Sequence, residues 1–300
     1  MLINKVVHKL GFLRKFPRPI AKIFFKFLIF FDHIFFEVRV FFLSLFLGKN
    51  NKVSKALKDL KNNGVAVISN FYGDEETKKI KDECIKYLDK IPVEKLKTRD
   101  YIDNMPVTLG NTKLYFERLG GSIKFKGLNN VSNYLKNIIR KYEIDLLIKT
   151  YHLILSEPLI VYNVTHTGSF QHPVMLNPEV NDKAIAGNPH VDLYFHQLRC
   201  FIALSDVEET NGPTIYYKKS LNINEIKKNH LNLILESFDF KVDKNESHVI
   251  NSKKIEYLDN MKAKSILKCK KGDLVLMDLK TVHYGTVPKN GERHLLWLYY

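Results

Sequence analysis

The sequence of 300 residues contains few cysteines, tryptophans, prolines and glycines: three, one, ten and fourteen respectively. The cysteines (Cys84, Cys200 and Cys269) are odd in number, widely spaced and form no C-x-x-C pair. This pattern excludes a disulfide framework and a cysteine zinc site, and it predicts a reducing, cytoplasmic compartment. The chain also lacks internal repeats and low-complexity tracts, so we expect one large domain with an appendage.

An excess of acidic residues is also lacking, and the formal net charge is +15. Nine lysines or arginines against two acidic residues fall within residues 1–50, and the other positive charges are scattered lysines. Scattered lysines are typical of a solvated surface. Because no RNA-binding or helix-turn-helix signature accompanies the charge, a nucleic-acid partner is the lowest-ranked hypothesis.

Residues 1–50 differ from the rest of the chain. A basic lead with Pro17 and Pro19 runs into an apolar stretch at 20–47, which five polar residues interrupt, too many for a clean transmembrane helix. At helical spacing these residues form a narrow stripe and a second polar spot, and phenylalanine and leucine cover the remainder. The interrupting residues are Lys26, Asp32, His33, Glu37 and Arg39.

This pattern predicts an amphipathic helix in a membrane interface, with peripheral contact through residues 1–48 on the cytoplasmic face. A secretory signal is disfavoured because the stretch carries charges and no small-residue cleavage site follows it. The alternative is a helix that packs on the main domain or on a second subunit, so a homo-oligomer stays open.

Helices precede strands in the remaining sequence, 51–300. We expect a short helix ending at Asn63-Gly64, a strand at 65–68, a helix capped by Asp74, and a long helix over about 131–155. From Leu159 the pattern changes to strands. This order predicts the α+β class. An insertion at 221–262 interrupts the strands, with a helix over 226–235, and we expect it to form a lid or rim.

Asn188-Pro189-His190-Val191-Asp192 is the first stretch that suggests chemistry. In an extended strand, residues i and i+2 point to the same face, so His190 and Asp192 would present an imidazole and a carboxylate together. Two histidines and one carboxylate form the facial triad that holds Fe(II) and leaves open positions for a substrate. A lone H-x-D is weak evidence in a chain with eleven histidines.

A second stretch strengthens this interpretation. Lys271-Gly272-Asp273 reads as a turn feeding a buried strand at 274–278, which would deliver His283 as a third ligand. Arg293 follows ten residues later, at the head of another apolar strand. An arginine deep in an apolar strand needs an anionic partner, and its planar guanidinium suits a carboxylate. A structural ion pair with a nearby Asp or Glu is the alternative.

The order of H-x-D, a distal histidine and an arginine ten residues on resembles the Fe(II)/2-oxoglutarate-dependent dioxygenase superfamily. Residues 201–213, with Leu204, Asp206 and the turn Asn211-Gly212-Pro213, are similar to the phytanoyl-CoA dioxygenase branch. The resemblance covers about residues 60–300. It implies a double-stranded β-helix, or jelly roll, with flanking helices, a domain over 51–300, and Fe(II), 2-oxoglutarate and O2 as cofactors.

The same resemblance implies a role for each site residue. His190, Asp192 and His283 would hold the iron, and Arg293 would bind the far carboxylate of 2-oxoglutarate. Related halogenases lack the carboxylate ligand, so the presence of Asp192 favours hydroxylation of a C–H bond. The sequence departs from the branch at 216–220, where Tyr-Tyr-Lys-Lys-Ser replaces a Pro-Gly-Ser-His pattern, and this departure leaves the substrate open.

Other polar residues compete weakly for these roles. We interpret four further histidines as structural or rim residues, and three hydroxyl-bearing residues as packing residues that alternatively hydrogen-bond 2-oxoglutarate. The histidines are His166, His172, His196 and His294, and the hydroxyl-bearing residues are Tyr162, Thr165 and Thr286.

The predicted activity is therefore a hydroxylase acting on a small-molecule or lipid-type substrate. The apolar N-terminal segment favours a lipid, an acyl chain or a lipid-linked glycan at a membrane, whereas a soluble metabolite would leave that segment for dimerisation. A non-catalytic jelly-roll module that binds an anionic ligand is the alternative from another class. Such a module would have no need of His190, Asp192, His283 and Arg293 together.

Overall fold

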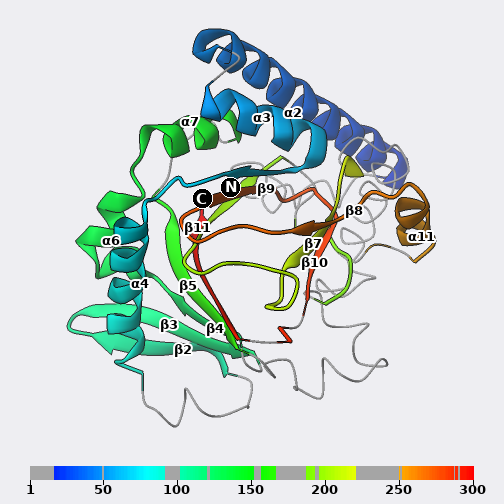
Figure 1. Ribbon diagram of the computed structural model, residues 1–300. Helices are drawn as coiled ribbons and strands as arrows, with labels where there is room; N and C mark the ends of the chain where they lie inside the picture. The colour runs from blue at the N-terminus through cyan, green and yellow to red at the C-terminus, as the bar shows by residue number, and fades with distance from the viewer. Residues whose placement is uncertain are drawn as a thin grey trace.

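Two antiparallel sheets face each other in the computed structural model of the chain (Figure 1). The structure describes residues 17–48, 51–91, 102–119, 122–151, 157–166, 187–192, 196–220, 250, 252–286, 288–289 and 291–300. The larger sheet has the strand order β1-β9-β6-β11-β5-β4-β3-β2, and the smaller has the order β10-β7-β8. The larger sheet's strands, in that order, are Val65–Ile68, Leu274–Asp278, Leu198–Ala203, Glu292–Tyr299, Leu159–His166, Ser122–Lys126, Thr112–Leu119 and Ile102–Leu109. The smaller sheet's strands are His283–Gly285, Thr214–Tyr217 and Lys264–Leu267.

Helices cover one side of the larger sheet, and the smaller sheet lies on the other side (Figure 1). The helices on this side are α2 (Arg18–Leu47), α3 (Lys52–Asn63), α4 (Asp74–Leu88), the 3-10 turn η2 (Leu128–Asn130), α6 (Asn133–Ile138) and α7 (Tyr142–Tyr151). Helix α11 (Ser252–Asn260) instead packs beside the smaller sheet, where its Leu258 belongs to the same buried cluster as Tyr217 of β7. A large antiparallel sheet with helices on one face confirms the predicted α+β class and is consistent with the predicted jelly roll.

Strand alternation places the buried side chains of β6 in two different core clusters. Along β6, Cys200 and Ile202 pack with the helices, whereas Phe201 and Ala203 pack between the two sheets. Because successive side chains of a strand point to opposite faces, a strand buried on both faces reads as a continuous apolar run. The inner cluster also contains Tyr216 of the smaller sheet, which lies opposite His283 in the register of β7 and β10.

The predicted helices differ from the structure in two places. The pattern over 131–155 forms two helices, α6 and α7, because a break after Ile138 lets both Ile139 and Ile144 reach the core. Asp74 is the first residue of α4 and Gly73 is its N-cap, so the predicted cap was wrong by one residue. The helix predicted over 226–235 lies outside the described residues, as does most of the 221–262 insertion.

Helix α2 packs against α3 and α7 along one face, which includes Ala21, Phe25, Asp32, Phe36 and Val40. These positions recur at helical spacing, as expected of one buried stripe. No helix in the described ranges combines the length and apolar character needed to cross a membrane. The contacts with α3 and α7 show that the inner face of α2 packs on the domain. Contact of its outer face with a membrane stays a prediction.

Candidate metal centre and co-substrate site

His190 and His283 form a two-residue antiparallel bridge that extends the smaller sheet by one position. Each backbone amide donates to the other residue's carbonyl at 2.9 Å, and the ring centroids lie 4.5 Å apart. Both residues are buried. The two histidines, 93 positions apart in the sequence, are thereby brought side by side as the sequence predicted.

The hydrogen bonds of both rings fix which nitrogen can bind a metal. The Nδ1 atom of His190 lies 2.7 Å from the carbonyl oxygen of Asn188, and that of His283 lies 2.9 Å from the carbonyl oxygen of Thr281. A carbonyl only accepts, so each Nδ1 carries a proton, and in the neutral form of each ring Nε2 is the nitrogen with the lone pair. Such a backbone bond is the usual support of a metal-binding imidazole.

Asp192 completes a group of three candidate ligands. Its carboxylate oxygens lie 3.4 Å from Nε2 of His190 and 3.8 Å from Nε2 of His283. Among the described residues, these three form the one group of histidine, cysteine or carboxylate side chains whose ligand atoms converge, all within 4.8 Å of one another. Two neutral imidazoles and one carboxylate fit Fe(II).

Charge and burial keep both kinds of ligand in the protonation state that a metal requires. Burial is the largest single influence and would raise the pKa of Asp192, but Arg199, His283 and His190 together outweigh it and hold that pKa well below its usual range. Burial lowers the pKa of His283 to about 4, against a smaller opposing effect of Asp192. The carboxylate is therefore ionised and His283 neutral at physiological pH.

Arg199 is a site residue that the sequence reasoning missed. Its Nη1 atom donates to Oδ2 of Asp192 at 2.5 Å, and its guanidinium lies over the ring of Tyr299 at 4.6 Å. The sequence did contain a signal for Arg199, because this arginine interrupts the apolar strand β6 just as Arg293 interrupts β11. It shares a face with Phe201, so it points into the space between the sheets.

A tight turn over 278–281 connects β9 to β10 and holds two ligands at once. The carbonyl of Leu279 accepts from the backbone amide of Asp192 at 3.0 Å, and the carbonyl of Thr281 accepts from the ring of His283. Gly64 lies against this turn with φ +79°, and a Cβ there would come within 2.0 Å of Thr281 Oγ1. The helix stop predicted at Gly64 therefore also leaves room for the ligand turn.

Arg293 lies at the start of β11, opposite Thr165 of β5 in register. One guanidinium nitrogen donates to the carbonyl of Gly212, and the other lies 3.3 Å from Thr165 Oγ1. The Nε atom is buried without a hydrogen-bond partner. No carboxylate of the described residues pairs with this arginine, so the structural ion pair considered above is not found there.

Burial lowers the pKa of Arg293 to about 10, so the side chain stays positively charged at neutral pH. A buried cation with an unused donor is costly unless an anion compensates it. The site therefore fits the distal carboxylate of 2-oxoglutarate.

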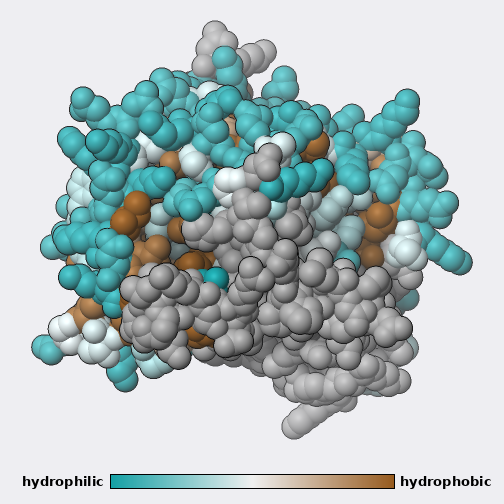
Figure 2. Space-filling view, turned by 60° about the horizontal axis from the view of Figure 1, so that its bottom comes forward, coloured by the Kyte–Doolittle hydropathy of each residue, from teal (hydrophilic) through white to brown (hydrophobic). Residues whose placement is uncertain are grey.

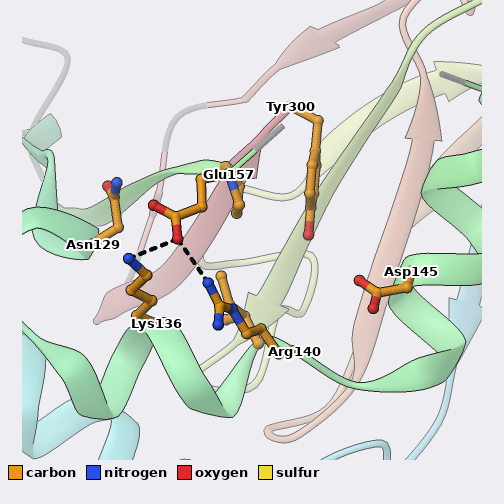
Figure 3. A pocket seen from close by; sticks show the side chains of 8 residues that line it. Asn129, Lys136, Arg140, Asp145, Glu157 and Tyr300 are labelled. Atoms are coloured by element: carbon orange, nitrogen blue, oxygen red, sulfur yellow. Dashed lines mark hydrogen bonds and ion pairs between the residues drawn. The ribbon is translucent and has the colours of Figure 1, made fainter. Parts of the chain in front are cut away.

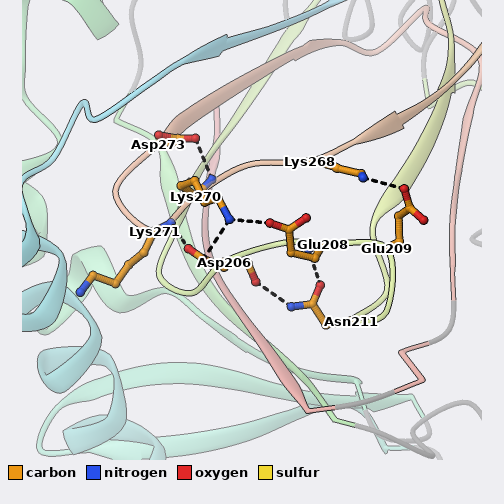
Figure 4. Close-up of polar contacts among 8 residues, drawn as sticks. All are labelled: Asp206, Glu208, Glu209, Asn211, Lys268, Lys270, Lys271 and Asp273. Carbon is orange, nitrogen blue, oxygen red and sulfur yellow. Dashed lines mark hydrogen bonds and ion pairs between the residues drawn. The ribbon is translucent and has the colours of Figure 1, made fainter.

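The loop that presents Gly212 to Arg293 is built by the two motifs of the sequence (Figure 4). Asp206 accepts from the backbone amide of Lys271 at 2.8 Å, and its own carbonyl accepts from the side chain of Asn211 at 2.7 Å. Gly212 has φ +79°, and a Cβ there would lie 2.9 Å from the ring of Pro288. The Asp and Asn-Gly-Pro positions therefore shape the Arg293 site.

The remaining histidines and hydroxyls have other partners. His196 Nδ1 lies 2.5 Å from Asp278 Oδ2, and His294 Nδ1 lies 2.7 Å from the hydroxyl of Tyr162. Thr286 donates to the carbonyl of Pro213 at 2.5 Å. Of the three hydroxyl candidates, Thr165 is the one beside Arg293. His172 and the side chain of His166 lie outside the described residues.

A surface pocket of about 240 Å³ lies near the C-terminus and is separate from this site (Figure 3). Glu157 accepts from Lys136 and Arg140 there, each at 2.7 Å. Tyr300 lines the pocket from the opposite end of β11 to Arg293. Seven residues of extended strand separate the two by about 23 Å, so this pocket does not receive the co-substrate.

Solved structures that resemble this chain share its fold. The epimerase SnoN in complex with Fe3+, alpha ketoglutarate and nogalamycin RO is 11% identical, with a TM-score of 0.51, covering 82% of each chain. HygX from Streptomyces hygroscopicus is 14% identical over 81% of this chain and 85% of its own (TM-score 0.46). EctD from S. alaskensis is 10% identical over 80% and 73% (TM-score 0.47). At such identities the SnoN match shows a shared fold.

The family itself is identified from the sequence. The family model for phytanoyl-CoA dioxygenase (PhyH) matches residues 60–292, which is most of the chain. A search of curated proteins finds no match. The chain belongs to the phytanoyl-CoA dioxygenase family, and it is a 2-oxoglutarate-dependent non-haem iron dioxygenase that uses Fe(II), 2-oxoglutarate and O2.

Proposed function

We propose that the protein hydroxylates a C–H bond, with His190, Asp192 and His283 holding Fe(II) and Arg293 binding the distal carboxylate of 2-oxoglutarate. The observation that carries the proposal is the convergence of two Nε2 lone pairs and one ionised carboxylate on a single point. Three protein ligands leave open metal positions for the co-substrate and O2. When bound, iron and 2-oxoglutarate supply dioxygen activation coupled to decarboxylation of 2-oxoglutarate to succinate and CO2.

The protein's own residues orient the reactants and control charge. The guanidinium of Arg293 remains protonated and offers its unpaired Nε donor to an anion. Arg199 holds the outer oxygen of Asp192, which fixes the carboxylate's orientation toward the two imidazoles. The packing of Phe201 and Tyr216 between the sheets keeps the neighbouring space apolar and excludes water.

For the substrate we propose a lipid, an acyl chain or a lipid-linked molecule. The support is the outer face of α2, which exposes large apolar side chains. The insertion at 221–262 is proposed as a lid or rim of the domain over 51–300. A soluble metabolite is the competing substrate class, and for it the face of α2 would serve another purpose.

A non-catalytic binding module stays the alternative from another class. It would need Arg293 to hold an anion, but it would not need two imidazoles whose Nδ1 atoms are both tied to backbone carbonyls. Retention of the whole constellation therefore favours catalysis.

Succinate formation tests the activity. The purified protein is incubated with Fe(II), ascorbate, O2 and labelled 2-oxoglutarate, with and without a detergent-dispersed lipid extract. We expect slow succinate release without substrate, stimulation by lipid, and loss of both in His190→Ala. Full turnover in His190→Ala would overturn the assignment of the iron ligands, and stimulation by a soluble metabolite extract alone would overturn the lipid substrate.

A further inference from the structure

The most prominent surface feature outside the metal centre is the outer face of α2. Twelve large apolar side chains of this helix are between 37 and 84% exposed, out of nineteen such residues in the described part of the chain. Phe27, Phe31 and Phe35 lie along it at four-residue intervals, each about half exposed. The helix of 30 residues is about 45 Å long. A continuous apolar strip of that length marks an interaction surface.

The rest of the visible surface has a different character. In the view of Figure 2, most of the described surface is hydrophilic, and hydrophobic side chains form small separate patches. Single exposed apolar residues are normal for a folded protein. The strip on α2 is exceptional because its members are contiguous on one helix.

The acidic groups of α2 are both paired with lysines. Asp32 is buried, 3.6 Å from Nζ of Lys280, and it accepts from the backbone amide of His196 at 2.9 Å. Glu37 pairs with Lys61 of α3. No acidic side chain of this helix is therefore free on its outer side.

The basic groups of α2 have the opposite placement. Lys22 and Lys26 are exposed, and within the described residues neither forms an ion pair. Lys52, Lys55 and Lys58 of the neighbouring helix α3 are exposed as well. Apolar side chains flanked by cations, without acidic residues, complement a bilayer that carries anionic lipid.

From these observations we infer that the outer face of α2 docks in the interface of an anionic lipid bilayer, with the helix parallel to the surface. The occupant is a lipid surface rather than a protein groove because the strip combines apolar width with unpaired cations. The buried contacts of Asp32 fix the helix's rotation, so the same face always points outward. Arg39 also fixes the rotation of α2, because its guanidinium donates to the carbonyl of Thr150 at 3.1 Å.

The contact of Asp32 also relates the membrane to the active site. Lys280 belongs to the turn over 278–281 whose carbonyls hold Asp192 and His283. Docking would therefore hold the metal centre at a fixed orientation to the bilayer. This inference rests on the proposed lipid substrate, which gives membrane docking its purpose. Vesicle binding is measured without turnover, so a failure of membrane docking and a failure of the proposed chemistry can be told apart.

Flotation of the full chain with vesicles tests the inference. We expect the protein to float with vesicles of phosphatidylcholine mixed with phosphatidylglycerol, and more weakly with phosphatidylcholine alone or at high salt. The variant Phe27→Ser/Phe31→Ser/Phe35→Ser should bind more than about a hundredfold more weakly, because three apolar side chains no longer enter the interface. Lys22→Gln/Lys26→Gln should lose roughly thirtyfold on the anionic vesicles alone.

Matched controls separate docking from misfolding. Tyr257→Ser/Met261→Ser removes exposed apolar groups from α11 and from the turn that follows it, and this variant should float like the wild type. All variants replace exposed residues, so their thermal unfolding should stay close to that of the wild type, and succinate release reports the proposed chemistry separately. Wild-type protein that stays unbound, or a triple variant that binds equally well, would overturn the inference. A wild-type dimer that the triple variant converts to a monomer, without lipid binding, would assign the face to a second copy and overturn it too.

Discussion

The rings of His190 and His283 lie 4.5 Å apart because their backbones exchange a pair of hydrogen bonds. The two Nδ1 atoms are each tied to a carbonyl two residues earlier in the chain. The same backbone geometry therefore places both imidazoles and fixes their tautomers. The predictions below follow from this pair and from the residues that support it.

Removing the metal should destabilise the protein. A metal bound to the folded state alone stabilises by about 2.7 kcal/mol when its free concentration is a hundred times the dissociation constant. We expect a chelator to lower the Tm in differential scanning calorimetry and Fe(II) to restore it under anaerobic conditions. In His190→Ala the Tm should no longer respond to Fe(II), and a response of wild-type size would contradict the assignment of that ligand.

Arg293→Ala should weaken 2-oxoglutarate binding by about 2 kcal/mol, because the distal carboxylate loses a charge-assisted bidentate partner. Arg293→Lys should recover only part of this affinity, since a lysine cannot form the planar fork. Calorimetric titration of the metal-loaded enzyme with 2-oxoglutarate measures the change. Thr165→Val is the control, and its expected loss is below about 1 kcal/mol. Equal losses of 2-oxoglutarate affinity in Arg293→Ala and Thr165→Val would contradict the role of Arg293.

Arg199→Ala should weaken metal binding by about tenfold to a hundredfold, because Asp192 loses the group that orients its outer oxygen. Competition with a fluorescent chelator reports the dissociation constant directly. Arg140→Ala removes another arginine–carboxylate pair, the one with Glu157 on the surface, and should leave metal affinity unchanged. If both variants bind metal like the wild type, Arg199 has no positioning role.

Asp32→Ala should lower the free energy of unfolding by about 3 kcal/mol, because Lys280 would be left as an uncompensated buried charge. Glu37→Ala is the matched control on the same helix. Its partner Lys61 is exposed, so we expect a cost below about 1 kcal/mol. Denaturant titration measures both. A small effect of Asp32→Ala would show that α2 is not anchored through this contact.

The sequence was sufficient to predict that His190, Asp192 and His283 converge in the fold. His190 and Asp192 share a local pattern, and the apolar strand before His283 carries its own turn signal. These are short-range features, which a sequence displays directly. The geometry now supports their proposed roles, and the family match independently establishes the cofactors.

The interruption of an apolar strand by Arg199 was visible in the sequence, but neither its partner nor the cluster around Asp32 was. Arg199 acquires its role only because β6 is brought beside the turn that holds Asp192. Asp32 was assigned to a second polar spot on the helix, and the structure shows it buried against Lys280, 248 residues away in the sequence. Contacts between distant segments depend on tertiary packing, which periodicity alone does not specify.

Anaerobic titration with Fe(II) and then 2-oxoglutarate is the measurement that tests the central claim most directly. The account predicts a metal-to-ligand charge-transfer band in the wild type that is absent in His283→Ala, together with succinate release when air is admitted. Far-ultraviolet circular dichroism would confirm that both proteins are folded. A folded wild type with no band and no succinate would contradict the account and favour the binding-module alternative.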